Sequence, residues 1–209
     1  MMLYACASCI LGWTGMTGIA QASLRTRGFD AALGRALRML IALVCVSGAL
    51  GAWFLLGNVI YCLSFSFACA CMAALLVCDL REHVLPSELV AVLLACALVF
   101  RVMEGGVTET IAIVLPTGTI AAIVLLFNYL RMHRGACELI GSGDVRMLVP
   151  LALFSGTEGL MCGVFACALL IGVLALVQLA TGRADRHSHI ALAPGLAAWL
   201  FAGTLLPLL

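Results

Sequence analysis

Residues 39–78 read MLIALVCVSGALGAWFLLGNVIYCLSFSFACACMAALLVC, forty residues without one charged side chain. A helix that crosses a bilayer needs about 20 mostly apolar residues, so this stretch is long enough for two crossings that turn near residues 57–58. Over the whole 209-residue chain, 65% of the residues are hydrophobic and 10% are charged, whereas soluble domains carry about 45–50% apolar and about 25% charged residues. The composition excludes a water-soluble globule and indicates an integral membrane protein.

Apolar segments on both sides of this stretch predict an all-α fold, a polytopic transmembrane helical bundle. The further spans, with few or no charged residues, cover residues 1–24, 84–103, 110–130, 159–182 and 190–209, and residues 147–157 form a shorter uncharged segment. If residues 146–182 cross twice, the chain has about eight spans and the sixth is short. We expect residues 1–209 to form a single integral-membrane domain.

The distribution of the arginines orients the bundle. Positive residues collect in cytoplasmic loops, and four arginines within residues 25–38 follow the first span, which places the N-terminus outside. If residues 146–182 cross twice, ten of the eleven arginines lie inside and only Arg101 lies outside. We therefore predict a multi-pass protein of the inner or plasma membrane with the lipid bilayer as a partner. The net charge of +1 and the lack of a basic run exclude nucleic acid as a partner.

Neither the cysteines nor the histidines predict a metal or a cofactor. Most of the eleven cysteines lie in uncharged stretches, which is typical of packing between helices. Cys6-Ala-Ser-Cys9 has the spacing of a metal or redox pair but no second pair. No pair among His133, His187 and His189 has helical metal spacing near an acidic ligand, so we predict no metal site.

Two aspartates stand apart from the other acidic residues, which read as solvated loop residues, among them Glu104, Glu109 and Glu158. Asp79 ends the uncharged run, and Asp144 begins the next apolar helix within LIGSGDVRMLV (residues 139–149). Because two spans separate them, both carboxylates should lie at one membrane face and at similar depth. Acidic residues at this depth are costly and usually functional. Interfacial solvation, or a helix N-cap role for Asp144, is the alternative for either residue alone.

Paired carboxylates can share one proton and activate water for attack on an amide, one acting as base and the other as acid. Gly141 and Gly143 lack side chains and would let backbone come close. The helix dipole disfavours a carboxylate at the end of the helix that carries Asp79 and favours one at the start of the helix that carries Asp144. We therefore expect Asp79 to hold the proton and Asp144 to be the base.

The residues around both aspartates resemble the two signatures of the type IV prepilin peptidases, which are GxGD-type intramembrane aspartic proteases. The first signature is Asp79-Leu-Arg-Glu-His-Val-Leu-Pro86, and the second is Gly141-Ser-Gly143-Asp144-Val-Arg146. Residues 190–197 also resemble the proline-containing last span of that family. The resemblance implies that Asp79 and Asp144 are catalytic and that Pro86, Gly141, Gly143 and Arg146 support them. Arg146 replaces the usual lysine, and Ser87 stands where asparagine or aspartate is common.

The resemblance implies an aspartic endopeptidase without a cofactor. Its substrates would be prepilin or pseudopilin proteins of type IV pilus and protein secretion systems, cut after a short basic leader at the cytoplasmic face. Glu82, Glu88 and Glu138 are candidate partners for that leader. Residues 25–38 contain no cysteine, so the chain resembles the short, peptidase-only branch that lacks a cytoplasmic zinc and methyltransferase domain.

Two alternatives stay open at this stage. In a small proton-coupled membrane transporter, the same aspartates would form a proton relay. Both acids are expected at one face rather than near the midplane, and the sequence contains no broken-helix repeat. The other alternative is a structural subunit of a secretion complex with an inactive protease fold.

Overall fold

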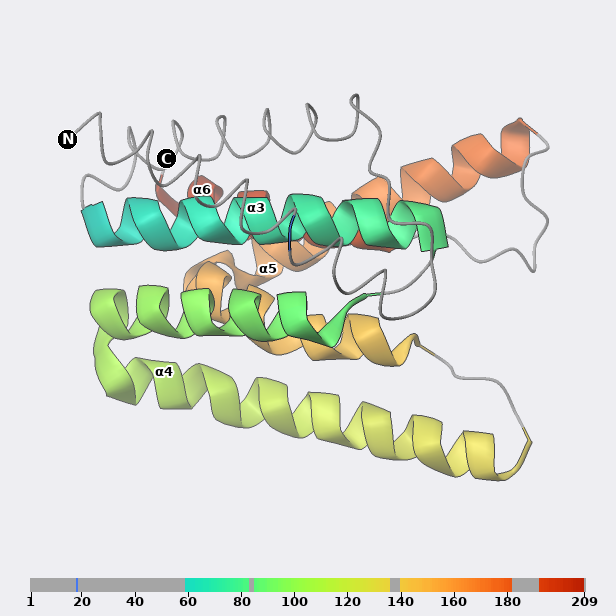
Figure 1. The fold of residues 1–209 in the computed structure, drawn as a ribbon, viewed down its shortest axis with the longest axis horizontal. Helices are drawn as coiled ribbons and strands as arrows, with labels where there is room; N and C mark the ends of the chain where they lie inside the picture. Colours follow the sequence, from blue (N-terminus) through green and yellow to red (C-terminus); the bar gives the residue numbers. More distant parts are fainter. Residues whose placement is uncertain (1–17, 19–58, 83–84, 136–139, 182–191, 209) are drawn as a thin grey trace.

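The computed structural model describes residue 18 and residues 59–82, 85–135, 140–181 and 192–208 (Figure 1). In these ranges the regular elements are all helical, which confirms the α class for this part of the chain. They are α3 (Val59–Glu82), α4 (Ser87–His133), α5 (Ser142–Ala180), α6 (Ala193–Leu205) and the short 3-10 helix η1 (Leu206–Leu208). α3, α4 and α5 are long and apolar enough to span a membrane. The expected spans before residue 59 lie outside the described residues, so the count of eight stays a prediction.

α4 and α5 each reverse direction at a glycine. Gly106 in α4 has φ +77° and Gly156 in α5 has φ +66°, a backbone conformation that glycine adopts at little cost. Figure 1 shows the two arms of α4 running side by side in opposite directions, and α5 folds back in the same way. The turn at Gly106 falls between the two spans expected at residues 84–103 and 110–130. The turn at Gly156 is the reversal that a double crossing of residues 146–182 requires.

The second arm of α5 (residues 157–180) packs against α6 through small residues. Side chains added at Gly159 and Gly163 would meet the carbonyl oxygen of Gly203 and the ring of Trp199, and one at Gly195 would lie 2.9 Å from the Cys167 sulfur. These contacts recur every four residues and run in opposite directions along the two helices. Small residues at this spacing allow close helix packing in membranes, where burial of apolar surface drives no association.

The second arms of α4 and α5 expose large apolar side chains to their surroundings. Leu115, Ile123, Met161 and Phe165 are all more than half exposed. A water-soluble protein rarely presents so much continuous apolar surface, whereas lipid tails cover it at no cost. This surface, together with the apolar composition, identifies a membrane protein.

The charged residues of the described helices lie near their ends and reversals, at two ends of the bundle. α3 runs antiparallel to the first arm of α4 (residues 87–105). The Tyr61 hydroxyl, near the start of α3, donates a hydrogen bond at 2.7 Å to the Met103 carbonyl, near the end of that arm. The end of α3 and the start of α4 therefore share one end of the bundle, which we call the aspartate end because Asp79 and Asp144 lie there. The opposite end, around Arg101 and the two reversals, is called the arginine end.

Candidate functional site

Asp79 is buried at the aspartate end, on the last turn of α3, and 6% of its surface is exposed. Its Oδ2 accepts a hydrogen bond from the backbone N–H of Ala193 at 2.9 Å. Ala193 is the first residue of α6, where helical N–H groups have no partner within the helix. Pro194 has no N–H, and the N–H groups of the next two residues bond to the Leu192 carbonyl. Asp79 therefore takes the N–H that α6 leaves free.

Asp144 lies in the first turn of α5 and is half-buried. The N-cap of this helix is Gly141, whose carbonyl accepts a hydrogen bond from the Val145 N–H at 3.2 Å. No side chain caps the helix. The N-cap position belongs to Gly141, so the alternative that Asp144 is the N-cap is wrong.

The two aspartates lie close enough for their carboxyl groups to interact electrostatically, and Asp144 also interacts with the Cys167 thiol. α3 and the two arms of α5 therefore converge on one site. Among the residues that the structure describes, neither aspartate forms an ion pair with an arginine. The pair thus sits among apolar helices without a described positive partner.

The glycines of the second motif are placed where close approach requires them. A Cβ on Gly143 would lie 3.0 Å from the Cβ of Leu85, and a Cβ on Gly141 would lie 2.7 Å from the Asp144 Oδ2. Gly143 therefore packs against the residue before Pro86, so the segments of the two motifs touch. A side chain at either glycine would push Leu85 or the Asp144 carboxylate out of position.

Pro86 and Arg146 occupy different environments around the pair. Pro86 is buried and is the N-cap of α4, and its carbonyl accepts a hydrogen bond from the Val90 N–H at 3.2 Å. Arg146 is exposed on α5. Pro86 is therefore enclosed at the start of α4, whereas Arg146 lies on the surface of α5.

Two partners of the site were missed by the sequence analysis. One is the backbone N–H of Ala193. The signal in the sequence was Pro194, because a proline in the first turn marks the start of a helix, where backbone N–H groups lack partners. The other is Asn128, the single amide side chain in the span expected at residues 110–130, which donates a hydrogen bond to the Ile140 carbonyl at 2.6 Å. Glu138 and His83 lie outside the described residues. Within the described ranges, no group of three histidine, cysteine or acidic residues is placed to hold a metal ion.

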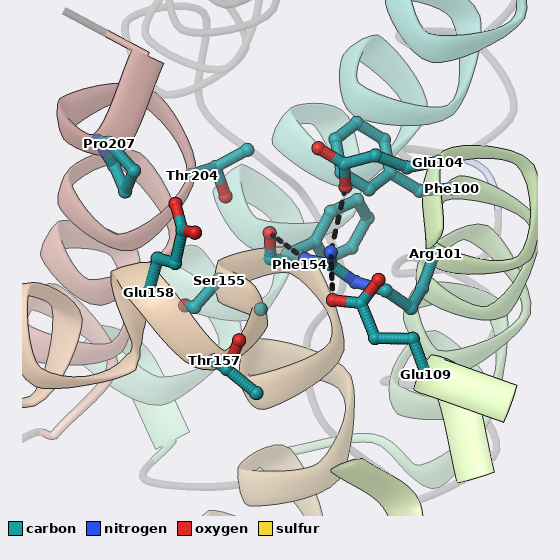
Figure 2. Close-up of a pocket in the computed structure, with 11 residues that line it drawn as sticks. Phe100, Arg101, Glu104, Glu109, Phe154, Ser155, Thr157, Glu158, Thr204 and Pro207 are labelled. Atoms are coloured by element: carbon teal, nitrogen blue, oxygen red, sulfur yellow. Dashed lines mark hydrogen bonds and ion pairs between the residues drawn. The ribbon is translucent and has the colours of Figure 1, made fainter. Parts of the chain in front are cut away.

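The arginine end holds a different polar cluster (Figure 2). Arg101 is 5% exposed and forms ion pairs with Glu104 at 2.9 Å and Glu109 at 3.2 Å. Its guanidinium also donates to the carbonyls of Leu153 at 2.8 Å and Phe154 at 3.3 Å, at the end of the first arm of α5. Those carbonyls precede the reversal at Gly156, so Arg101 satisfies backbone acceptors that the helix end leaves open.

Arg101 and its glutamates differ from the sequence prediction. We expected both glutamates to be solvated loop residues, but they form ion pairs with Arg101, which is buried, and all three residues lie within α4. They border a polar cavity of about 200 Å³ whose wall includes Glu158 and Thr204 (Figure 2). Packing of α5 against α4 buries Arg101. Its hydrogen bond to the Leu153 carbonyl joins residues that are 52 positions apart, and the ends of a predicted span give no information about such a contact.

The apolar helices and the paired aspartates together define a helical membrane protein with an acidic site inside its bundle. A family model described as the type IV leader peptidase family matches residues 66–176, just over half of the chain. The chain belongs to this family of peptidases. Both motifs lie inside the matched range, whereas α6 lies beyond it. Searches of curated proteins and of solved structures found no match.

Proposed function

We propose that this chain is an intramembrane aspartic endopeptidase that removes the leader from prepilin or pseudopilin proteins at the cytoplasmic membrane face. The proposal rests on the placement of Asp79 and Asp144 near enough for their carboxyl groups to interact electrostatically, within apolar helices of a leader peptidase family member. Two carboxylates at close range hold one proton between them more easily than two charges. That state supplies a base and an acid at one site.

In this mechanism the ionised aspartate takes a proton from water while the water oxygen bonds to the carbon of the scissile amide. The protonated aspartate donates its proton to the amide oxygen, which gives a gem-diol. The aspartate that took the water proton then protonates the leaving nitrogen, and the other aspartate takes a proton from the gem-diol as the C–N bond breaks and the carbonyl re-forms. The site holds no described arginine that would neutralise the pair. The proton balance therefore stays between the two carboxyl groups.

The hydrogen bond from Ala193 supports a role for Asp79 opposite to the one expected from the helix dipole. An N–H donor at 2.9 Å stabilises a carboxylate oxygen more than a neutral carboxyl oxygen. The N-terminal end of α6 adds a favourable dipole. Asp144 also has a favourable position in the first turn of α5, but among the described residues it has no N–H donor comparable to that of Ala193, so in our proposal Asp79 is the base and Asp144 holds the proton.

The substrate fits the surroundings of the site in charge and polarity. Glu88 is exposed in the first turn of α4, next to Pro86, where a carboxylate could attract a basic leader. The apolar arms of α4 and α5 continue past the site and would lie beside the hydrophobic helix that follows the leader. The arginine distribution supports the cytoplasmic face for this end of the bundle in our proposal.

A cleavage assay tests the proposal. The purified full chain is reconstituted in liposomes and incubated with a prepilin that carries its leader, and the N-terminus of the product is identified by mass spectrometry. The matched blank is the double variant Asp79→Asn and Asp144→Asn, which keeps side-chain size and removes both acids. We expect one cut at the junction between leader and apolar helix, seen only with the wild type. Equal cleavage by the blank, or none by the wild type, would contradict the proposal.

A further inference from the structure

Asn128 is the polar residue that the second arm of α4 (residues 107–133) buries most completely, at 3% exposure. The neighbours Phe127 and Tyr129 are at least half exposed, so this part of the helix faces outward except at Asn128. An amide in an apolar membrane helix costs free energy unless its hydrogen bonds are made. Its burial therefore calls for a partner of specific position.

One partner is the backbone carbonyl of Ile140, which accepts a hydrogen bond from the Asn128 Nδ2 at 2.6 Å. The carbonyl can only accept, so the amide nitrogen must face it. Ile140 is followed directly by Gly141, the N-cap of α5. Asn128 therefore holds the peptide group through which the chain enters the helix that carries Asp144.

The start of α5 is held by two contacts with other segments. Gly143 packs against Leu85, from the connection between α3 and α4, and Asn128 holds Ile140, the residue before the N-cap. Asp144 lies one residue beyond Gly143. The position of its carboxyl group relative to Asp79, on α3, therefore depends on both contacts.

We infer that Asn128 is a positioning residue that sets the separation of the Asp144 and Asp79 carboxyl groups. The inference rests on the proposed function for its catalytic consequence. The geometric part does not depend on catalysis, because a shifted α5 terminus also changes how Asp144 meets solvent and reagents. Misplacement of a reacting group by about 1 Å costs on the order of 10²-fold in rate.

Asn128→Leu removes the donor, keeps a similar volume and suits an apolar helix, so it should insert and fold. We expect kcat for prepilin cleavage to fall about 10- to 100-fold with KM within about twofold. The pH profile of kcat should change shape, because the interaction between two coupled carboxyl groups depends on their separation. Asn128→Gln, which retains an amide donor, should recover part of the rate.

The matched control is Thr119→Val on the same arm of α4. Thr119 is exposed and its hydroxyl donates to the Leu115 carbonyl of its own helix at 2.6 Å, so its loss should leave kcat and the pH profile unchanged. A lower kcat in Asn128→Leu with an unchanged pH profile and no recovery in Asn128→Gln would reduce Asn128 to a structural residue. Wild-type kcat in Asn128→Leu would overturn the inference outright.

A second measurement separates this inference from the proposed function. Dicyclohexylcarbodiimide labels protonated carboxyl groups in membranes, and mass spectrometry gives the labelling rate of Asp144 whether or not the chain cleaves anything. We expect Asn128→Leu to raise that rate several-fold, because the loosened first turn of α5 exposes the carboxyl group, and Thr119→Val to leave it unchanged. Equal rates in wild type and Asn128→Leu would contradict the positioning role even if cleavage is never observed.

Discussion

The two polar ends of this bundle treat their acidic residues in opposite ways. At the arginine end, Glu104 and Glu109 share the guanidinium of Arg101, which also binds two backbone carbonyls. At the aspartate end, Asp79 and Asp144 interact electrostatically with each other, and among the described residues Asp79 accepts a hydrogen bond from a neutral N–H and neither pairs with an arginine. Removal of one partner from a buried ion pair destabilises a fold, whereas carboxyl groups left to interact with each other have shifted proton affinities that suit catalysis.

The glycines at the two ends also differ in what they contribute, a backbone turn at one end and a packing contact at the other. Gly156 at the arginine end needs its positive φ to turn the chain, and a side chain there would also meet the Arg101 guanidinium. Gly143 at the aspartate end has an ordinary helical backbone and is needed only for its contact with Leu85. One glycine therefore shapes the fold, and the other shapes the distance between motifs.

The largest expected effect on cleavage is caused by the loss of one carboxyl group at the aspartate end. Asp79→Asn or Asp144→Asn should each reduce cleavage roughly 10²- to 10⁴-fold, the range contributed by general acid or base catalysis, while thermal unfolding in detergent stays near the wild type. Cleavage rates and unfolding temperatures of both variants check this. Glu158→Gln, at the arginine end, is the matched control and should retain the wild-type rate. Full activity in either aspartate variant would refute the assignment.

Loss of Arg101 should have the reverse effect, lower stability with a nearly unchanged cleavage rate. Arg101→Met leaves two glutamates and the carbonyls of Leu153 and Phe154 without their donor, so the free energy of unfolding should fall by about 3 kcal/mol. The rate per folded molecule should stay within about twofold, because the site is at the other end of the bundle. Adding Glu104→Gln and Glu109→Gln should recover part of the stability. An unchanged unfolding temperature in Arg101→Met would show that its ion pairs contribute little.

Substitution of Gly143 tests whether the aspartate end depends on contact distance. Gly143→Ala places a Cβ 3.0 Å from that of Leu85, so we expect the cleavage rate to drop about tenfold through displacement of Asp144; Gly143→Val should be inactive. Gly118→Ala is the control, since a Cβ at Gly118 meets nothing within 4 Å. A rate in Gly143→Ala equal to that of Gly118→Ala would show that the contact is not limiting.

The smallest effect is expected at Thr204, on the wall of the arginine-end cavity. Its Oγ1 is buried without a hydrogen-bond partner among the described residues. Thr204→Val has nearly the same shape and removes this unpaired hydroxyl, so the protein should be unchanged or more stable by up to about 1 kcal/mol. Thermal unfolding measures the change. A clear loss of stability would mean that the hydroxyl has a partner such as a bound water.

Part of the site could be predicted because its signals are local. The aspartates were conspicuous because so few charges interrupt the apolar chain, and an even number of spans between them placed both at one end. The role expected from the helix dipole followed only from each aspartate's own helix. It did not include Ala193, which is 114 residues from Asp79 in sequence and gives Asp79 a donor from another helix.

The sequence alone determined that this chain is an α-helical membrane protein of the leader peptidase type. Apolar segments of this length form helices in a bilayer, and each of the two motifs is an unbroken run of residues that can be recognised without the fold. Only the tertiary structure decided that Arg101 is buried, that Ala193 binds Asp79 and that Asn128 holds Ile140. Each of these hydrogen bonds joins separate helices or a helix to a loop. Which groups pair depends on the depth and rotation at which the helices pack against each other. The hydropathy of a single span does not determine that relative position.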